Sequence, residues 1–415
     1  MTPSLEEGGE GIFPAEAIDG QLTGFTGILV RKILSLLKSG VLTIELPGGM
    51  RVRHAGARPG PAAAIKLHSW RLIRRLALNG DIGLARSYVD GDWSTPDLTA
   101  LFDLGLVNSA PLMDAISGSP PFRALNWLAH RLKANTRQGS RRNIEAHYDL
   151  GNDFYRTWLD ASMSYSSALY RSEDMTLEDA QAAKTRRIIE KLDVDPNACV
   201  LEIGCGWGGL AASIARQTGA HVTGVTISPA QLARAKELTR EEGLEGKVEL
   251  RLQDYRDLAG VFDRIVSIEM LEAVGREFIP RYFEILRSRL RPGGSAVLQV
   301  ITIAEDRFAA YCQRPDFIQR YIFPGGFLPT KTLLRDEIER AGLKLTESEA
   351  FGGSYALTLR EWRRRFLLAW PEIQKQGFDR TFKRLWRYYL SYCEAAFRAG
   401  AIDVGWYSVE HAGNA

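Results

Sequence analysis

The sequence predicts an α/β protein with a doubly wound, mainly parallel sheet, preceded by a small α+β domain and followed by amphipathic helices. Three observations lead to this prediction. From about residue 196, strand-like and helix-like segments alternate, the strands are almost continuously apolar, and a glycine-rich turn joins the first strand to its helix. The 415 residues, 45% of them hydrophobic, are enough for two or three domains.

Residues 25–110 have the mixed pattern of the small α+β domain. A helix is predicted at 27–37, and short strands at 41–46 and 51–54 flank a Pro-Gly-Gly turn. A strand at 63–68, a helix over 68–80 that ends at a glycine, and a second helix at 82–91 follow. The Gly- and Glu-rich residues 1–24 are expected to be disordered, and 111–140 to form a basic connector.

Two blocks of this region carry basic residues and no acid. Residues 46–80 contain Arg51, Arg53, Arg58, Lys66, Arg71, Arg74 and Arg75, and residues 115–144 contain Arg123, Arg131, Lys133, Arg137, Arg141 and Arg142. Such blocks suit an anionic surface, and a solvated face is the alternative. Trp70, Phe122 and Trp127 interleave with the charges, which favours a membrane interface over nucleic acid.

The second domain is predicted over 141–415, with its repeating strands and helices taken in order. Strands are expected at 199–204, 221–228, 247–254, 262–270 and 295–303, with helices at 208–219, 229–243 and 280–294 between them. Ser228 and Pro229 form a helix start, and Gly293–Gly294 a glycine C-cap. Aromatic, basic helices follow at 359–370 and 378–400, the second expected in the core or at a homodimer interface.

The loop VLEIGCGWGG (200–209) indicates a nucleotide-type cofactor. Read as GxGxxG, with Gly204, Gly206 and Gly209, it could bind NAD, but the second strand then supplies Thr226 where an acid should hold the ribose. Glu202 before the glycines and Asp254 at the end of the third strand instead fit the E-x-G-x-G pattern of S-adenosylmethionine (SAM) methyltransferases. A purely structural turn is the remaining alternative.

Two carboxylates in VSIEMLEAVG (266–275) stand where a buried parallel strand should give way to a loop. Glu272 is expected at the carboxyl end of the strand, where open α/β sheets place ligands, and Glu269 is expected to be a structural hydrogen-bond acceptor. Four scattered cysteines without CxxC spacing indicate reduced thiols and no metal site. With no apolar run of about 20 residues and no signal-peptide pattern, a cytoplasmic location is expected.

Several stretches together resemble cyclopropane-fatty-acyl-phospholipid synthases. They are AHYDLGNDFYRTWLDASMSYSSALY (146–170), LEIGCGWGG (201–209), GVTISPAQ (224–231), DRIVSIEMLEAVG (263–275), QRYIFPGGFLP (319–329) and YYLSYCEAAFRAG (388–400). The resemblance runs over about residues 25–405. It implies a class I SAM methyltransferase that adds a methyl carbon to a cis double bond of a phospholipid acyl chain, at the inner face of the membrane.

The chemistry sets the residue types that such a site needs. An alkene is a weak nucleophile, so positioning must supply much of the catalysis, and aromatic faces can stabilise the resulting carbocation. A base must then remove a proton so that the ring can close. The resemblance implies bicarbonate as this base, held by Glu272 and Tyr355 with Ser167, Ile301 and Gln299. For SAM it points to Tyr165, Ser166, Glu202, Gly204, Gly206, Thr226, Ile227, Gln231, Gln253 and Asp254.

Three positions depart from the family's usual residues. Ala273 and Gln299 stand where relatives have His, and Ser167 where they have Cys. Since neither Gln299 nor Ser167 titrates like His, methylation without ring closure, giving a methyl-branched, methylene-branched or furan-precursor chain, stays open beside the cyclopropane product. The sequence is also compatible with a small-molecule N- or C-methyltransferase and with a non-catalytic SAM- or lipid-binding protein.

Overall fold

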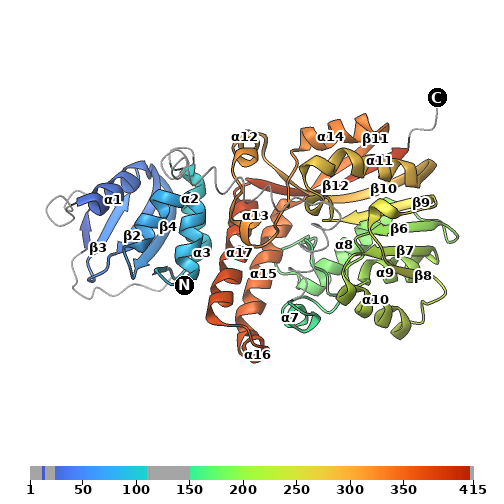
Figure 1. The fold of residues 1–415 in the computed structure, drawn as a ribbon, viewed down its shortest axis with the longest axis horizontal. Helices are drawn as coiled ribbons and strands as arrows, with labels where there is room; N and C mark the ends of the chain where they lie inside the picture. Colours follow the sequence, from blue (N-terminus) through green and yellow to red (C-terminus); the bar gives the residue numbers. More distant parts are fainter. Residues whose placement is uncertain (1–11, 15–23, 110–111, 113–149, 412–415) are drawn as a thin grey trace. The chain divides into compact units, whose positions relative to one another are not determined.

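The computed structural model describes residues 12–14, 24–109, 112 and 150–411, and these form two compact units (Figure 1). Unit 1 comprises described residues up to Ala124 together with Arg380–Ala399, and unit 2 comprises the others from Leu125 to Asp379 and from Gly400 onward. The predicted connector at 111–140 lies outside the described residues except for residue 112. No helix in the described ranges is long and apolar enough to cross a bilayer.

Unit 1 is a five-stranded sheet covered by helices. Its elements are β1 (Ile12–Pro14), α1 (Gly24–Leu36), β2 (Ser39–Glu45), β3 (Arg51–Ala55), β4 (Arg58–Leu67), α2 (Arg71–Val89), β5 (Trp93–Ser94), α3 (Leu98–Val107) and α17 (Arg380–Arg398). The strand order is β1-β3-β2-β4-β5. β2 alternates buried and half-buried residues because successive side chains point to opposite faces of the sheet.

Of three predictions for unit 1, the structure confirms one, modifies the second and contradicts part of the third. The Pro-Gly-Gly turn joins β2 and β3 as predicted, and Gly48 and Gly49 both have positive φ. The predicted break between two helices appears as a kink at Gly80 inside α2 (φ 59°, ψ −134°). Residues 12–14, predicted to be disordered, pair in parallel with β3 as β1, and the remaining predicted disorder at 1–11 and 15–23 lies outside the described residues.

Helix α17 packs in unit 1, although the sequence-based division placed 141–415 in one domain. Arg384 donates hydrogen bonds to the Tyr88 and Trp93 carbonyls (2.5 and 2.6 Å), and its guanidinium lies 3.9 Å from the centre of the Tyr88 ring. Thr99 donates to the buried Glu394 carboxylate (3.1 Å). The amphipathic pattern identifies a helix with a buried face, but it does not say which sheet or helix that face covers.

Unit 2 is a seven-stranded, mainly parallel sheet with helices on both faces (Figure 1). Its strands are β6 (Cys199–Ile203), β7 (His221–Thr226), β8 (Val248–Leu252), β9 (Phe262–Ile268), β10 (Leu290–Ile303), β11 (Leu343–Ala350) and β12 (Ile402–His411). Its α-helices are α7 (Asn152–Arg156), α8 (Leu177–Leu192), α9 (Gly209–Thr218), α10 (Pro229–Glu241), α11 (Ile279–Arg289), α12 (Glu305–Gln313), α13 (Phe317–Tyr321), α14 (Lys331–Arg340), α15 (Gly352–Leu368) and α16 (Trp370–Lys375). Short 3₁₀ turns are η2 (Tyr255–Asp257), η3 (Leu271–Ala273) and η4 (Arg276–Phe278).

The order β11-β12-β10-β9-β6-β7-β8 confirms the predicted doubly wound sheet. Strands β8, β7, β6, β9 and β10 are parallel, and β12 is antiparallel to both of its neighbours. The sequence analysis did not predict β11 or β12. β12 pairs with β10 although about a hundred residues separate the two strands in the sequence, so no local sequence pattern predicts this pairing.

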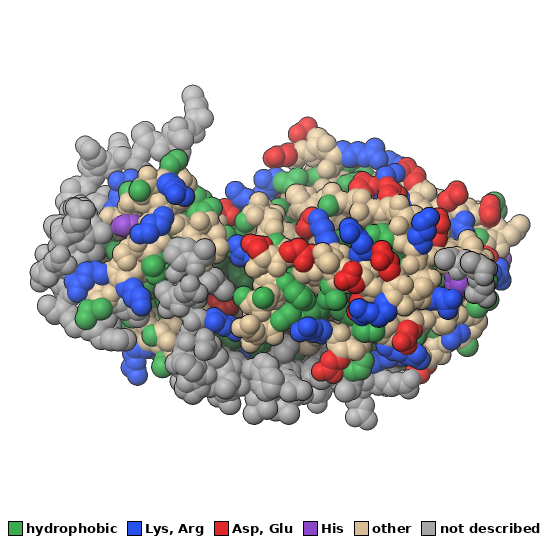
Figure 2. Space-filling model, turned by 90° about the horizontal axis from the view of Figure 1, so that it is seen from above, with side chains coloured by type: hydrophobic (Ala, Val, Ile, Leu, Met, Phe, Trp, Pro, Cys, Tyr) green, Lys and Arg blue, Asp and Glu red, His purple; other side chains and the backbone are tan. Residues whose placement is uncertain are grey.

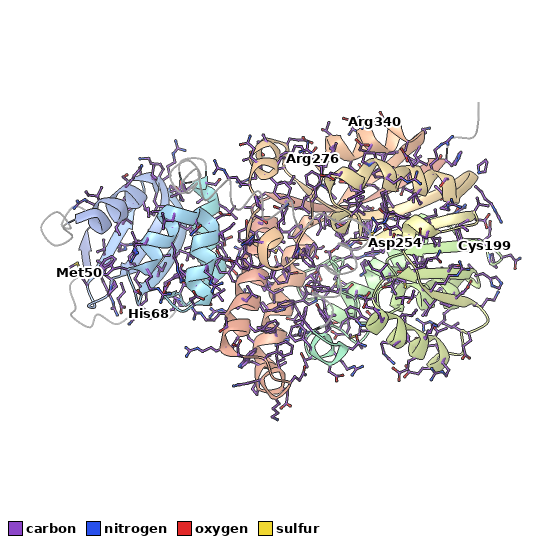
Figure 3. All side chains as sticks on the ribbon, viewed as in Figure 1. Met50, His68, Cys199, Asp254, Arg276 and Arg340 are labelled. Carbon is purple, nitrogen blue, oxygen red and sulfur yellow. The ribbon has the colours of Figure 1, made fainter. Side chains whose placement is uncertain are left out.

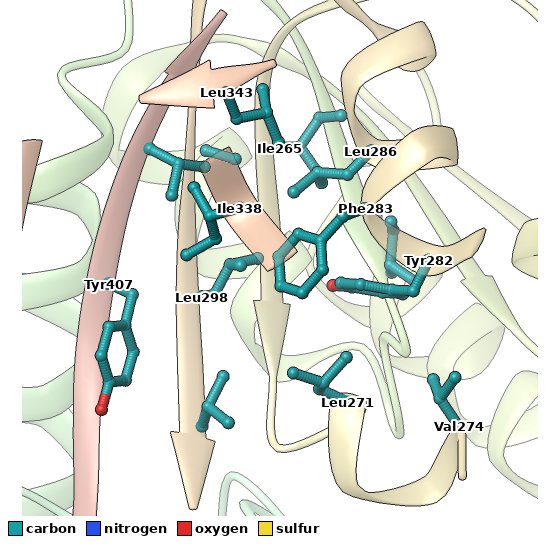
Figure 4. Packing of buried hydrophobic residues seen from close by; sticks show 14 of the residues in the cluster. Ile265, Leu271, Val274, Tyr282, Phe283, Leu286, Leu298, Ile338, Leu343 and Tyr407 are labelled. Carbon is teal, nitrogen blue, oxygen red and sulfur yellow. The ribbon is translucent and has the colours of Figure 1, made fainter. Parts of the chain in front are cut away.

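Apolar residues on the two faces of the sheet form two cores. In β10, Leu298 joins the cluster that includes residues of α11 and α14, whereas its neighbour Val297 joins the cluster with α8 and α9. The first cluster, which includes Phe283 and Ile338, is shown in Figure 4. This alternation follows from the two-residue repeat of a strand and explains why the strands read as continuously apolar.

The start of α10 and the end of α11 can be compared with the caps predicted from the sequence. Ser228 caps α10 as predicted, because its hydroxyl accepts a hydrogen bond from the Gln231 N–H (3.3 Å) and Pro229 takes the first turn. The glycine C-cap predicted for the 280–294 helix is wrong: α11 ends at Arg289, and the buried Leu290 is already extended and pairs with Phe262. Gly293 instead lies in an irregular stretch of β10.

Candidate active site

The candidate site lies at the carboxyl ends of the parallel strands. The glycine loop follows β6, Ile227 follows β7, Asp254 follows β8, and Glu269 follows β9. Figure 3 shows Asp254 at the opposite end of the strand layer from Cys199, which opens β6. Segments that are far apart in sequence meet there because parallel strands end at the same edge of a sheet.

The glycine loop has the open backbone that a nucleotide-type ligand requires. Gly204, Gly206 and Gly208 have φ of 82°, 51° and 86°, values that disfavour other residues. Gly204 is exposed although it directly follows the mostly buried strand β6, and a Cβ at Gly204 would stand 2.9 Å from the Met270 side chain. The loop leads into α9, whose first N–H groups attract negative or electron-rich ligand groups. This backbone fits SAM.

The other predicted SAM residues lie around this loop. The Thr226 hydroxyl donates to Gln231 (2.9 Å), and the Gln253 backbone N–H donates to the Thr226 carbonyl (3.0 Å), so this edge is fixed by its own hydrogen bonds. Asp254 accepts hydrogen bonds from the Arg256 guanidinium at 2.6 and 2.8 Å. Ile227 directly follows Thr226, and its side chain is half-buried.

Glu202 is a buried acid behind the glycine loop. Burial raises its pKa to about 8, and in the described part of the chain its Oε2 is a buried atom without a hydrogen-bond partner. Lys184 of α8 is also buried; desolvation lowers its pKa to about 8, and nearby carboxylates oppose that shift. Lys184 donates to the Ser166 hydroxyl (2.8 Å) and therefore connects α8 to the segment around Tyr165.

An aromatic cluster surrounds Tyr165. Its ring centre lies 5.3 Å from those of Tyr155 and Trp362 and 5.6 Å from that of Trp158. Tyr155 also contacts Trp207 of the glycine loop, with ring centres 5.2 Å apart. These electron-rich rings therefore lie beside the predicted cofactor loop, where they could stabilise a positive charge.

Glu269 is the centre of the cluster predicted to hold an anion. Its carboxylate accepts hydrogen bonds from the Tyr355 hydroxyl (2.6 Å), the Gln299 amide (2.7 Å) and the Ser167 backbone N–H (2.8 Å). These are three of the groups that the resemblance assigned to bicarbonate. Glu269 is a hydrogen-bond acceptor as predicted, but its location in the middle of the site was not foreseen.

Glu272 lies next to Glu269 and is bound differently. It accepts a hydrogen bond from the Ile301 backbone N–H, and its Oε2 is a buried atom with no hydrogen-bond partner in the described ranges. Burial, and then the charge of Glu269, raise the pKa of Glu272 to about 8. Burial and their mutual repulsion therefore disfavour ionisation of both carboxyl groups at the same time.

The residues of this cluster do not fit a bound bicarbonate. Gln299 and Ser167 have no exposed surface and Tyr355 is 6% exposed, whereas Glu269 is only half-buried. A bicarbonate would have to displace the Glu269 carboxylate to reach their donors. It would also add a negative charge beside two glutamates in a poorly solvated place, which is costly.

Sequence reasoning missed the residues that hold this cluster in place. The Trp406 indole of β12 donates to the Gln299 side-chain oxygen (2.8 Å), and Thr358 of α15 accepts from the Ala168 N–H (3.1 Å). Asn152 of α7 accepts from the Trp207 indole of the glycine loop (2.8 Å). Only the register of β12 against β10, with Trp406 opposite Gln299, could have identified the first of these.

Comparison with known proteins places this geometry in a family. The family model described as mycolic acid cyclopropane synthetase matches residues 135–406. The chain is 37% identical to the tuberculostearic acid methyltransferase UfaA1 of Mycobacterium tuberculosis (80% of this chain, 79% of that protein). It is 38% identical to the cyclopropane-fatty-acyl-phospholipid synthase of Escherichia coli (82% of this chain, 86% of that protein).

A solved structure supports the same assignment. The mycolic acid cyclopropane synthase CmaA1, complexed with SAH and CTAB, superposes with a TM-score of 0.61 at 28% identity, covering 65% of this chain and 98% of that one. The range that the family model matches contains the glycine loop. The chain therefore belongs to the mycolic acid cyclopropane synthetase family and is a SAM-dependent C-methyltransferase.

Proposed function

We propose that the protein transfers a methyl carbon from SAM to the cis double bond of a phospholipid acyl chain and closes a cyclopropane ring. The observation that carries this proposal is the extent of the likeness. The match to the Escherichia coli phospholipid enzyme covers 82% of the chain, more than unit 2 contains, whereas the match to the mycolic acid synthase structure covers 65%. That match therefore extends beyond unit 2 into part of unit 1, as the match to UfaA1 also does.

The residues of the site have complementary roles in this reaction. SAM, when bound, supplies the electrophilic methyl carbon. The glycine loop and Asp254 would hold it, and Tyr165 with its neighbouring rings would stabilise the carbocation that forms on the acyl chain. Glu269, Glu272 and their donors would form the place where the proton is removed. The chain's own groups thus provide positioning, cation stabilisation and a place for the base.

Unit 1 supports peripheral binding to an anionic membrane, which would be the inner face of the cytoplasmic membrane. Four of the seven basic residues at 46–80 form ion pairs with acids outside that block: Arg51 and Lys66 with Glu45, Arg71 with Asp92, and Arg75 with Asp90 and Asp92. Arg53, Arg58 and Arg74 are exposed. In Figure 2, the described part of unit 1 shows blue side chains with few red ones. The block at 115–144 lies outside the described residues.

A second candidate product is a methyl- or methylene-branched acyl chain. Gln299 favours it, because an amide cannot shuttle a proton as a histidine can. The likeness to a protein named tuberculostearic acid methyltransferase points the same way. Both products need the same carbon transfer and differ in how the carbocation is resolved.

The products of one incubation separate these functions. The full chain is mixed with SAM and vesicles of cis-unsaturated phospholipid, and the acyl chains are analysed by mass spectrometry. A gain of about 14 Da with the alkene lost indicates ring closure, and the same gain with an alkene retained indicates methylene branching, since each adds one carbon and loses one proton. No gain on any lipid, together with methylation of soluble amines, would contradict the proposed function.

A further inference from the structure

The three groups that contact Glu269 are all donors, and one of them is fixed in that role. An indole nitrogen can only donate a hydrogen bond, so Trp406 must face the oxygen of the Gln299 amide. The amide nitrogen of Gln299 is thereby turned toward Glu269, at 2.7 Å. The Ser167 backbone N–H also donates to Glu269, and the Ser167 hydroxyl is directed to the Ala168 carbonyl (3.0 Å). The three contacts therefore favour the ionised form of Glu269 and oppose the burial that raises its pKa.

The backbone at Glu269 is also held in an uncommon conformation. Its φ is 49°, one of three positive values at non-glycine residues in the described ranges. Such a conformation is unfavourable for a non-glycine residue and persists where the surroundings impose it, often at functional sites. The Glu269 N–H donates to the Gln299 carbonyl (2.8 Å), so backbone and side chain are fixed by the same residue.

We propose that the Glu269 carboxylate is the resident base of this enzyme and takes the place of bicarbonate. The inference rests on the proposed function, because it concerns the proton that the acyl-chain intermediate must lose. Three observations support it: the donors are already occupied, Glu269 keeps accessible surface while its donors are buried, and the neighbouring Glu272 already competes for negative charge.

The step is a single proton transfer. The alkene has formed a carbon–carbon bond to the transferred methyl group, leaving a carbocation on the acyl chain. A C–H bond of that methyl group breaks, the proton goes to a Glu269 oxygen, and the electron pair forms the third bond of the ring. In the branched alternative, a hydride first shifts from the methylated carbon to the neighbouring cationic carbon, and the electron pair of the broken C–H bond then forms a carbon–carbon double bond between the methylated carbon and the transferred carbon. The proton then leaves Glu269 for solvent, and no oxidant or reductant is needed.

The same contacts limit the side reaction of a carboxylate with a carbocation. Three hydrogen bonds of 2.6–2.8 Å withdraw electron density from the Glu269 oxygens and fix their direction. Ester formation would require the oxygen to move onto the cation and break these bonds. Proton transfer needs only that the C–H group approach a carboxylate that stays in place.

The first arm of the test is binding of carbon-13-labelled bicarbonate to the full chain, followed by the broadening of its NMR signal. Wild type is expected to bind none, because its own carboxylate occupies the donors. Glu269→Gly should bind it, since glycine accepts the positive φ without strain and leaves the donors open. Specific binding to wild type, with no gain in Glu269→Gly, would overturn the inference whether or not the lipid reaction is found.

The second arm is turnover on unsaturated phospholipid vesicles in bicarbonate-depleted buffer. Wild type should keep its turnover rate, whereas the turnover rate of Glu269→Gln should be lower by about 100-fold or more, as expected for loss of a general base. Added bicarbonate should raise the turnover rate of Glu269→Gly by about tenfold. Glu284→Gln, an exposed change on α11, is the matched control and should leave turnover unchanged. A wild-type rate that disappears without bicarbonate would overturn the inference. A wild type that modifies no lipid would overturn the proposed function, and the binding arm would still decide whether Glu269 excludes the anion.

Discussion

At the scale of single residues, the site depends on buried ionisable groups whose neighbours decide their charge. Glu269 accepts hydrogen bonds from three donors, whereas Glu272 accepts one from the backbone N–H of Ile301. Two glutamates only three positions apart in the sequence therefore have different surroundings. Glu202 is a third acid and is fully buried, and Lys184 is the buried cation that favours its ionised form. A site with this many poorly solvated groups gains function at a cost in stability.

Glu202 should make the apo protein less stable as the pH rises toward 8. Its pKa is about 8 in the folded protein and 4.5 in its ordinary state, so between these values the folded chain binds a proton that the unfolded chain has lost. Unfolding free energy then falls with increasing pH, at most by about 1.4 kcal/mol per pH unit. Glu202→Gln cannot ionise, and its melting temperature should fall less than that of wild type between pH 5.5 and 7.5.

Glu284→Gln is again the control, because Glu284 is exposed on α11 and paired with Arg281. Its melting curve should follow wild type across the same pH range. Parallel pH profiles for wild type and Glu202→Gln would contradict the assignment of a raised pKa to this acid.

At the scale of elements, two late segments of the chain complete a site that the central strands begin. β12 brings Trp406 to Gln299, and α15 brings Tyr355 to Glu269. One turn of α15 also supports the segment after Tyr165: Ser354 accepts from the Tyr170 N–H (3.0 Å), and Thr358 accepts from the Ala168 N–H (3.1 Å). The position of the Ser167 N–H next to Ala168 therefore depends on this helix.

Thr358→Val should destabilise the protein and slow the reaction together. Valine keeps the shape but leaves the buried Ala168 N–H without its acceptor, a loss of about 1–3 kcal/mol. Because Ser167 precedes Ala168, its hydrogen bond to Glu269 should also weaken, and kcat should fall more than KM changes. Thermal unfolding and steady-state kinetics on lipid vesicles measure both effects.

Thr346→Val is the matched control on β11. The Thr346 hydroxyl donates to the Ser408 carbonyl (3.1 Å), as the Thr358 hydroxyl donates to the Ser354 carbonyl (2.8 Å). Thr346 is exposed, however, so water can replace the lost bond. Its unfolding free energy should stay within about 0.5 kcal/mol of wild type. Equal losses in the two variants would show that the buried contact of Thr358 has no special role.

At the scale of the whole molecule, the order of the chain does not follow the division into units. α17 belongs to unit 1 although the methyltransferase sheet is completed only by β12, which follows it. The family model, which matches residues 135–406, accordingly includes a helix that packs in unit 1. Since Arg384 and Glu394 hold α17 to unit 1, we expect a cut between 379 and 380 to damage both units.

The sequence was sufficient for the features that depend on local pattern. The apolar strands, the glycine loop and the Ser228 cap are each set by neighbouring residues, and the structure confirms them. The resemblance also identified Tyr355, Gln299 and Ser167 as residues that converge.

What could not be predicted depends on long-range contacts. The pairing of Trp406 with Gln299 and the placement of α17 join parts of the chain that are distant in sequence. The role of Glu269 is of the same kind, because its three donors come from segments around 167, 299 and 355. The motif around Glu269 alone does not indicate which distant segments will donate hydrogen bonds to its carboxylate.

In the proposed reaction, the protein adds a carbon to an unsaturated acyl chain and then removes a proton from that carbon. SAM with a fully deuterated methyl group tests it directly, with vesicles of cis-unsaturated phospholipid and mass spectrometry of the acyl chains. Loss of one deuteron to the base predicts a gain of about 16 Da, whereas loss of a hydrogen from the acyl chain itself would give about 17 Da. A gain of about 16 Da supports the claim. A gain of about 17 Da, or none on any lipid, would contradict it.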